Sequence, residues 1–224
     1  MKSKDTWLSL GYTVPRLCLR DAIPEIFIAA KYLNEAVSAH FANKPQLAAE
    51  LIALANKPEI RKVIGEWADS LRGKYNFYNR PISEVSPKLN KEQRPKLRMP
   101  STEDKLYLLR RDGFHCRFCG IPVLRKEVRK SLISLYPGAI PWGLPNSENH
   151  AALYAMDAQY DHLLPHSRGG SSDLDNLVIT CNPCNYGRGE HTLEEMGLAD
   201  PRTREPIHTA WDGLERLLDH SKQK

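Results

Sequence analysis

Two Cys-x-x-Cys pairs constrain the fold of this 224-residue chain more than any other feature. The first pair is Cys116 and Cys119, and the second, Cys181 and Cys184, follows far downstream. Four thiolates supply the closed tetrahedral site that structural zinc prefers. A redox function for one pair is the alternative, but it would leave the other pair unexplained. The sequence therefore predicts that one Zn²⁺ ties two distant segments together, while the solitary Cys18 is expected to be a buried thiol.

The expected cellular compartment supports this interpretation of the cysteines. The sequence has no apolar run of about 18 residues that could span a membrane, and no signal-peptide pattern at its N-terminus. We therefore expect a cytoplasmic protein without membrane contact. Cytosolic thiols stay reduced, so paired cysteines there are more often metal ligands than disulfides.

The first third of the chain has the pattern of helices. Apolar residues recur at three- and four-residue steps from Asp21 to Asn43, and similar runs follow Pro45 and Pro58. Gly73 is the expected stop of the third helix. Catalytic residue types do not cluster in this region. We expect residues 1–78 to form a helical accessory region.

Residues 79–100 have a different character. Their prolines exclude a continuous helix, and their charge is strongly basic. The basic residues are Arg80, Lys88, Lys91, Arg94, Lys96 and Arg98. We predict a basic, Pro-rich linker, which is consistent either with a solvated tether or with a segment along a phosphate backbone. The net charge of +5 suits a polyanionic partner without requiring one.

A second unit is expected from Ser101 onward. Ser101 and Asp104 form a capping-box-like start for a helix that ends near Arg111. A long insertion over residues 121–159 contains a basic helix candidate and a Pro-rich bend. Residues 199–224 have the pattern of a C-terminal amphipathic helix.

An ordered series of polar residues leads into the second cysteine pair. Asp161 and His162 are adjacent, residues 167–170 suit a glycine turn, Asn176 precedes a β-branched run, and Asn185 follows the last cysteine. A carboxylate is a natural Mg²⁺ ligand, and a neutral imidazole is a natural base near neutral pH. Each residue alone would be interpreted as a buried, hydrogen-bonded side chain. Together they predict a β-hairpin and a helix with one divalent ion between them.

Residues 101–198 resemble an HNH nuclease of the ββα-metal superfamily, in the subgroup with two Cys-x-x-Cys pairs and Asn at the third signature position. The resemblance rests on three stretches: Tyr-Asp-His-Leu-Leu-Pro-His-Ser-Arg-Gly-Gly (160–170), Asp-Asn-Leu (175–177) and Cys-Asn-Pro-Cys-Asn (181–185). It implies an α+β, mostly helical chain in which the helical N-terminal region precedes a zinc-stabilised ββα-metal domain.

The resemblance also implies a role for each signature residue. His162 would be the general base that deprotonates the attacking water. Asp161 and Asn185 would hold the catalytic Mg²⁺ or Mn²⁺. Asn176 would brace the hairpin loop and keep His162 in position. In this family the products carry 5′-phosphate and 3′-hydroxyl ends.

Arg168 and Arg188 are the candidate phosphate contacts, although each is equally consistent with a solvated charge. The expected partner is double-stranded DNA, and the expected setting is bacterial or phage defence, restriction or a mobile element. Two alternatives stay open. One is a zinc-stabilised nucleic-acid-binding module without cleavage, which has no need of a metal-ligand pair beside a base. The other is the nuclease subunit of a larger complex, with a protein partner or a second copy bound through residues 1–78.

Overall fold

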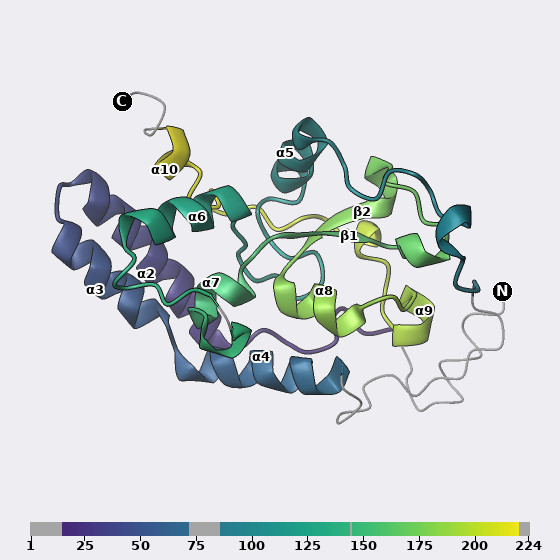
Figure 1. Cartoon of the computed structure of the whole chain (residues 1–224), viewed down its shortest axis with the longest axis horizontal. Helices are drawn as coiled ribbons and strands as arrows, with labels where there is room; N and C mark the ends of the chain where they lie inside the picture. Colours follow the sequence, from purple (N-terminus) through teal and green to yellow (C-terminus); the bar gives the residue numbers. More distant parts are fainter. Residues whose placement is uncertain (1–14, 72–85, 144, 220–224) are drawn as a thin grey trace.

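The computed structural model describes residues 15–71, 86–143 and 145–219 (Figure 1). It has the predicted α+β architecture, in which many helices surround one two-stranded sheet. The three helices predicted for the N-terminal region are α2 (Pro24–Phe41), α3 (Pro45–Ala55) and α4 (Pro58–Leu71). Each begins at a proline, whose fixed φ and missing N–H suit the first turn of a helix. The expected stop at Gly73 lies outside the described residues.

The N-terminal helices pack against the rest of the chain. Helix α2 contacts α3, while α4 lies against α7 (Ala151–Ala155) and α8 (Asn182–Arg188). A continuous cluster of buried apolar side chains runs from Leu33 of α2 to Ile179 of the sheet. In Figure 1, α4 runs beside α8, whereas α3 lies on the outer side of α2, away from the hairpin. No helix in the described part of the chain is long and apolar enough to cross a membrane.

The second unit begins where the capping residues predict. Ser101 Oγ accepts from Asp104 N at 3.1 Å, and Ser101 N donates to Asp104 Oδ2 at 3.3 Å. Helix α5 (Thr102–Arg111) follows this capping box. Helix α6 (Lys126–Leu135) lies in the insertion, and α9 (Leu193–Met196) follows α8. The predicted basic helix of the insertion corresponds to α6.

The predicted hairpin is present. Strands β1 (Gln159–His162) and β2 (Leu177–Thr180) are antiparallel partners. In the loop between them, Gly169 has a φ of +90°, and a β-carbon at Gly170 would overlap the carbonyl of Leu164. Only glycine meets both requirements without strain. The loop also contains two 3-10 turns, His166–Arg168 and Leu174–Asn176.

The described part of the predicted linker crosses the hairpin loop. We call residues 86–100 the strap; it contains one 3-10 turn, Lys91–Gln93. Four hydrogen bonds fix it to the loop: Leu89 N to Ser167 O (2.8 Å), His166 Nε2 to Pro95 O (2.8 Å), Ser172 Oγ to Leu97 O (3.0 Å) and Arg168 Nη1 to Ser86 O. The strap is therefore not a solvated tether. Residues 79–85 of the predicted linker lie outside the described residues.

The C-terminal amphipathic helix predicted over residues 199–224 is wrong for most of its described length. The helical pieces there are a 3-10 turn at Pro201–Thr203 and α10 (Arg216–Asp219). Pro206 cannot donate a helical hydrogen bond, and Gly213 has a φ of +67°, so the segment between the pieces is irregular. Its apolar residues still pack inward, because Leu214 is fully buried. Residues 220–224 lie outside the described part.

Candidate active site and metal centre

The two cysteine pairs converge on one point. Cys116 and Cys119 lie in the turn after α5, whereas Cys181 caps the N-terminus of α8 and Cys184 lies in its first turn. The four Sγ atoms all lie within 4.8 Å of one another, and those of Cys119 and Cys181 are 3.7 Å apart. A tetrahedron with Zn–S bonds of about 2.3 Å places its sulfurs about 3.8 Å apart. The cluster therefore fits the predicted structural zinc.

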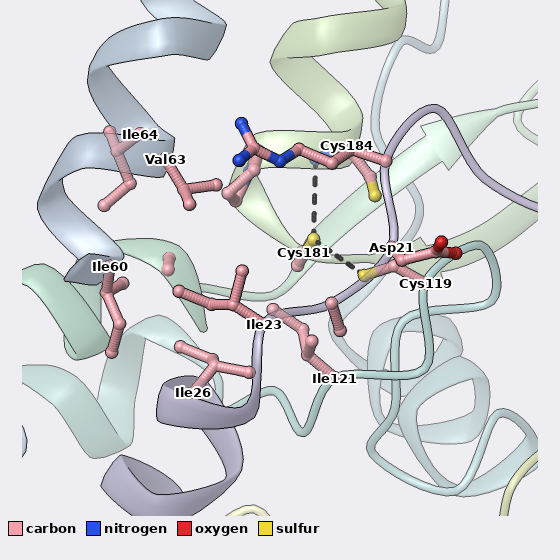
Figure 2. A pocket seen from close by; sticks show the side chains of 14 residues that line it. Asp21, Ile23, Ile26, Ile60, Val63, Ile64, Cys119, Ile121, Cys181 and Cys184 are labelled. Atoms are coloured by element: carbon pink, nitrogen blue, oxygen red, sulfur yellow. Dashed lines mark hydrogen bonds between the residues drawn. The ribbon is translucent and has the colours of Figure 1, made fainter.

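The N-terminal helices cover one side of this cysteine cluster. Figure 2 shows a small apolar pocket, about 40 Å³ in volume, that three of the cysteines share with the start of α2 and with α4. The apolar side chains drawn there include Ile23, Ile26, Val63 and Ile64. Residues from the expected accessory region thus form part of the environment of the cysteines.

The three residues expected to catalyse cleavage line one larger cavity, about 880 Å³ in volume. Strand β1 supplies Asp161 and His162, and α8 supplies Asn185 from its fourth position. The strap forms another wall of the same cavity. The hairpin and the strap thus bring together residues that are far apart in the sequence.

The ring of His162 is held by a hydrogen bond that fixes its tautomer. His162 Nε2 lies 3.0 Å from Ser172 Oγ, and this hydroxyl donates its single proton to Leu97 O, also at 3.0 Å. The hydroxyl can then only accept from the imidazole, so Nε2 carries the ring proton. Nδ1 is therefore the unprotonated nitrogen of His162.

The charge state of His162 follows from its surroundings. Burial lowers the pKa of His162 to about 4, and His166, Arg188 and Arg98 act in the same direction. The imidazole is therefore neutral at neutral pH. His166 packs edge-on against it, with the ring centroids 5.8 Å apart, and its own Nε2 donates to the strap. His166 is thus a hydrogen-bonding residue of the loop that joins it to the strap.

Asp161 is buried and paired with Arg188. The guanidinium Nε lies 3.0 Å from Oδ2, and Nη2 donates to Oδ1. Burial raises the pKa of Asp161, while the charge of Arg188 opposes this rise. A carboxylate offers about four lone-pair positions, so two bonds from arginine leave room for a metal ion. The oxygen donors of Asp161 and Asn185 fit a hard divalent cation.

Neither predicted phosphate-contacting arginine is free on the surface. Arg188 is 1% exposed, and beyond its ion pair it donates to the carbonyl of His191 at 2.7 Å. The side chain of Arg168 is 7% exposed, pairs with Glu195 at 2.9 Å and donates to Glu190 O at 2.9 Å. Both guanidiniums thus bind groups inside the fold, and contact of either one with phosphate stays a prediction. The carboxylates that they pair with, Asp161 and Glu195, are distant in sequence, so no local pattern indicated these ion pairs.

Asn176 spans the hairpin loop as the sequence suggested. Its Oδ1 accepts from Leu164 N at 2.9 Å, and its Nδ2 donates to Leu164 O at 3.2 Å and to Ser171 O at 2.8 Å. These bonds join the two ends of the loop that carries Ser172. Whether they matter for His162 stays a prediction.

Sequence reasoning missed two features of this region. Ser172 gave no signal, because a loop serine is common and its partners come from both the hairpin and the strap. Asp112 is 1% exposed and accepts from Ile179 N at 2.7 Å and from Arg111 Nε at 2.8 Å. The Asp112-Gly113 step indicated only a turn, yet this carboxylate joins the end of α5 to β2.

Comparison with known proteins matches this geometry. Residues 153–198, about a fifth of the chain, match the family described as HNH endonuclease. The match contains β1, β2 and α8, so the predicted resemblance is confirmed for the hairpin and its helix. It indicates a nuclease acting on nucleic acid, in general terms, and the cysteine cluster indicates zinc. No curated protein and no solved structure matched.

Proposed function

We propose that this protein is a metal-dependent endonuclease that hydrolyses phosphodiester bonds in double-stranded DNA, with His162 as the general base. The observation that carries the proposal is the single cavity lined by Asp161, His162 and Asn185. The match of the hairpin and helix to HNH endonucleases supports the same chemistry. A bacterial or phage defence, restriction or mobile-element setting is part of the proposal and follows from family analogy.

The residues of the cavity divide the chemistry between them. Nδ1 of His162 would accept the proton of the attacking water, because Nε2 is engaged with Ser172. Asp161 and Asn185 would hold Mg²⁺ or Mn²⁺, which would neutralise charge on the scissile phosphate and the leaving oxygen. Asn176 would keep the loop behind His162 in place. By resemblance to the family, the products would carry 5′-phosphate and 3′-hydroxyl ends.

The four cysteines would have a separate, structural task. A zinc ion there would join the turn after α5 to the start of α8, and α8 carries Asn185. The geometry of the cavity would then depend on an ion that takes no part in the reaction.

Attachment to a larger complex is the second candidate and concerns the N-terminal helices. Phe27 of α2 and Leu47 and Leu54 of α3 are between 43% and 54% exposed. Exposed apolar side chains on two contacting helices are consistent with a protein partner or a second copy of the chain. Their role would be docking, with cleavage left to the cavity.

Plasmid cleavage tests the proposed function. Wild type and His162→Ala would be compared with and without Mg²⁺, with His208→Ala as the matched control. His208 is exposed and does not line the cavity. Loss of a general base should reduce the rate by about 10²- to 10⁴-fold, while the control should cut normally. Equal cleavage by His162→Ala would refute the assignment of the base. DNA binding without any cleavage by wild type would favour the binding module instead.

A further inference from the structure

The strap presents basic side chains to the cavity that contains the expected catalytic residues. This cavity is lined by three exposed basic residues of the strap, Lys91, Lys96 and Arg98. None of the three side chains forms an ion pair or hydrogen bond with another described residue. Arg98 is near enough to His162 that its charge helps to lower the pKa of that imidazole. The wall that the strap forms is therefore rich in unpaired positive charge.

Acidic groups do little to neutralise this wall. Glu92 is the single acidic residue of the strap. Of the other carboxylates that line the cavity, Glu190 pairs with Lys88 of the strap, and Asp161 pairs with Arg188. The strap cations thus face a cavity whose remaining charge is positive.

The strap also has a defined position relative to the catalytic residues. His166 and Ser172, which bond its backbone at Pro95 and Leu97, are the same residues that contact the ring of His162. Arg94 does not join the free cations, because its Nε donates to Leu89 O at 3.0 Å and so holds the 3-10 turn. Cations on a fixed backbone bind a polyanion with less loss of conformational entropy than cations on a flexible tail.

We propose that the strap is a binding wall for the sugar-phosphate backbone, on which Lys91, Lys96 and Arg98 contact phosphates of the nucleic-acid strand that enters the cavity. This inference rests on the proposed function, since it concerns the substrate of the same cavity. Such contacts position a strand without reading its bases. Arg168 and Arg188, which the sequence suggested for this task, are engaged inside the fold.

Binding of DNA measured without cleavage tests the inference. The parent protein is the full chain with His162→Ala, and the probe is a fluorescein-labelled DNA duplex followed by anisotropy at several KCl concentrations. The test variant adds Lys91→Ala, Lys96→Ala and Arg98→Ala. The control variant instead adds Lys31→Ala, Lys44→Ala and Lys130→Ala. The control residues are exposed, do not line the cavity, and lose the same total charge.

The two variants should differ in salt dependence. Each phosphate contact contributes about 0.9 to the slope of log K against log salt, so the strap variant should lose about 2.7 of that slope. Raising KCl from about 50 to about 200 mM weakens DNA binding by both proteins. The factor by which the affinity falls should then be roughly 40-fold smaller for the strap variant than for the parent. The control variant should keep the slope of the parent.

Each outcome decides between the two ideas. Equal loss of slope in both variants, or no loss in either, would overturn the strap as a binding wall. Displacement of the duplex by inorganic polyphosphate with equal effect on both variants would show only general polyanion attraction and would overturn it too. If wild type fails to cleave but the strap variant alone loses the slope, the strap assignment survives and the nuclease proposal fails. If wild type cleaves DNA but the strap variant binds it like the parent, the nuclease proposal survives and the strap assignment fails.

Discussion

Substitution of Arg188 is the most direct test of the structure against the sequence motif. Removing one partner of a buried ion pair typically costs about 3–5 kcal/mol, because the remaining charge stays buried without compensation. Asp161 would be that charge, since it is 5% exposed. The carbonyl of His191 would lose its donor as well. Arg188→Met should therefore lower the free energy of unfolding by at least the lower end of this range.

Thermal unfolding followed by circular dichroism measures this effect. For a chain of this size, 1 kcal/mol corresponds to about 2–4 °C in Tm, so Arg188→Met should lower Tm by roughly 6–20 °C. Arg98→Met is the matched control because Arg98 is exposed, and surface substitutions usually stay within about 0.5 kcal/mol. Arg98→Met should instead weaken DNA binding.

A double variant separates the ion pair from simple loss of packing. Replacing both charges by apolar groups of similar size is often neutral or stabilising. Arg188→Met combined with Asp161→Leu should therefore be more stable than Arg188→Met alone. If Arg188→Met keeps the Tm of wild type but loses affinity for DNA, the ion-pair reasoning is refuted and the phosphate contact is restored.

Three further predictions concern the metal centre, a buried histidine and the base. Cys181→Ser removes one of the four thiolates, so it should lower Tm. A chromogenic chelator should also detect less bound Zn²⁺ in this variant than in the wild type. His150 is fully buried, and burial lowers its pKa below 6.5, so the unfolded state binds the extra proton. The free energy of unfolding should stay constant above about pH 6.5 and fall as pH drops below it. Urea titrations should show a smaller fall for His150→Gln than for the wild type. Ser172→Ala should lower kcat by about tenfold with little change in KM, whereas Ser172→Thr keeps the hydroxyl and should retain activity; equal rates for both would remove Ser172 from any positioning role.

Local signals predicted much of the fold. Pro24, Pro45 and Pro58 start three helices, and the cap at Ser101 starts a fourth. The glycine turn also lies where the motif placed it, because Gly170 leaves no space for a β-carbon. Each of these signals depends on backbone conformations within a few residues, which sequence patterns report well.

Contacts between distant segments were out of reach of such signals. The strap lies on the hairpin loop through carbonyls of Pro95 and Leu97, and every residue has a carbonyl regardless of its side chain. A Pro-rich basic segment has the same composition whether it is solvated or docked. The C-terminal segment shows the converse error, since Leu214 is buried by tertiary packing and not by an amphipathic helix.

Arg188, however, could have been placed from the sequence with a geometric step that the motif alone omits. At about 100° per residue, Arg188 lies about 60° from Asn185 around helix α8 but only about 40° from Cys184. Cys184 must face the other cysteines, so the residue four positions later shares its inward side. The burial pattern agrees: Cys184 and Arg188 are buried, Asn185 is partly exposed, and Tyr186 is exposed. A basic residue four positions after a zinc-binding cysteine on a short helix should therefore be assigned to the interior first, and to phosphate only if no buried acid faces it.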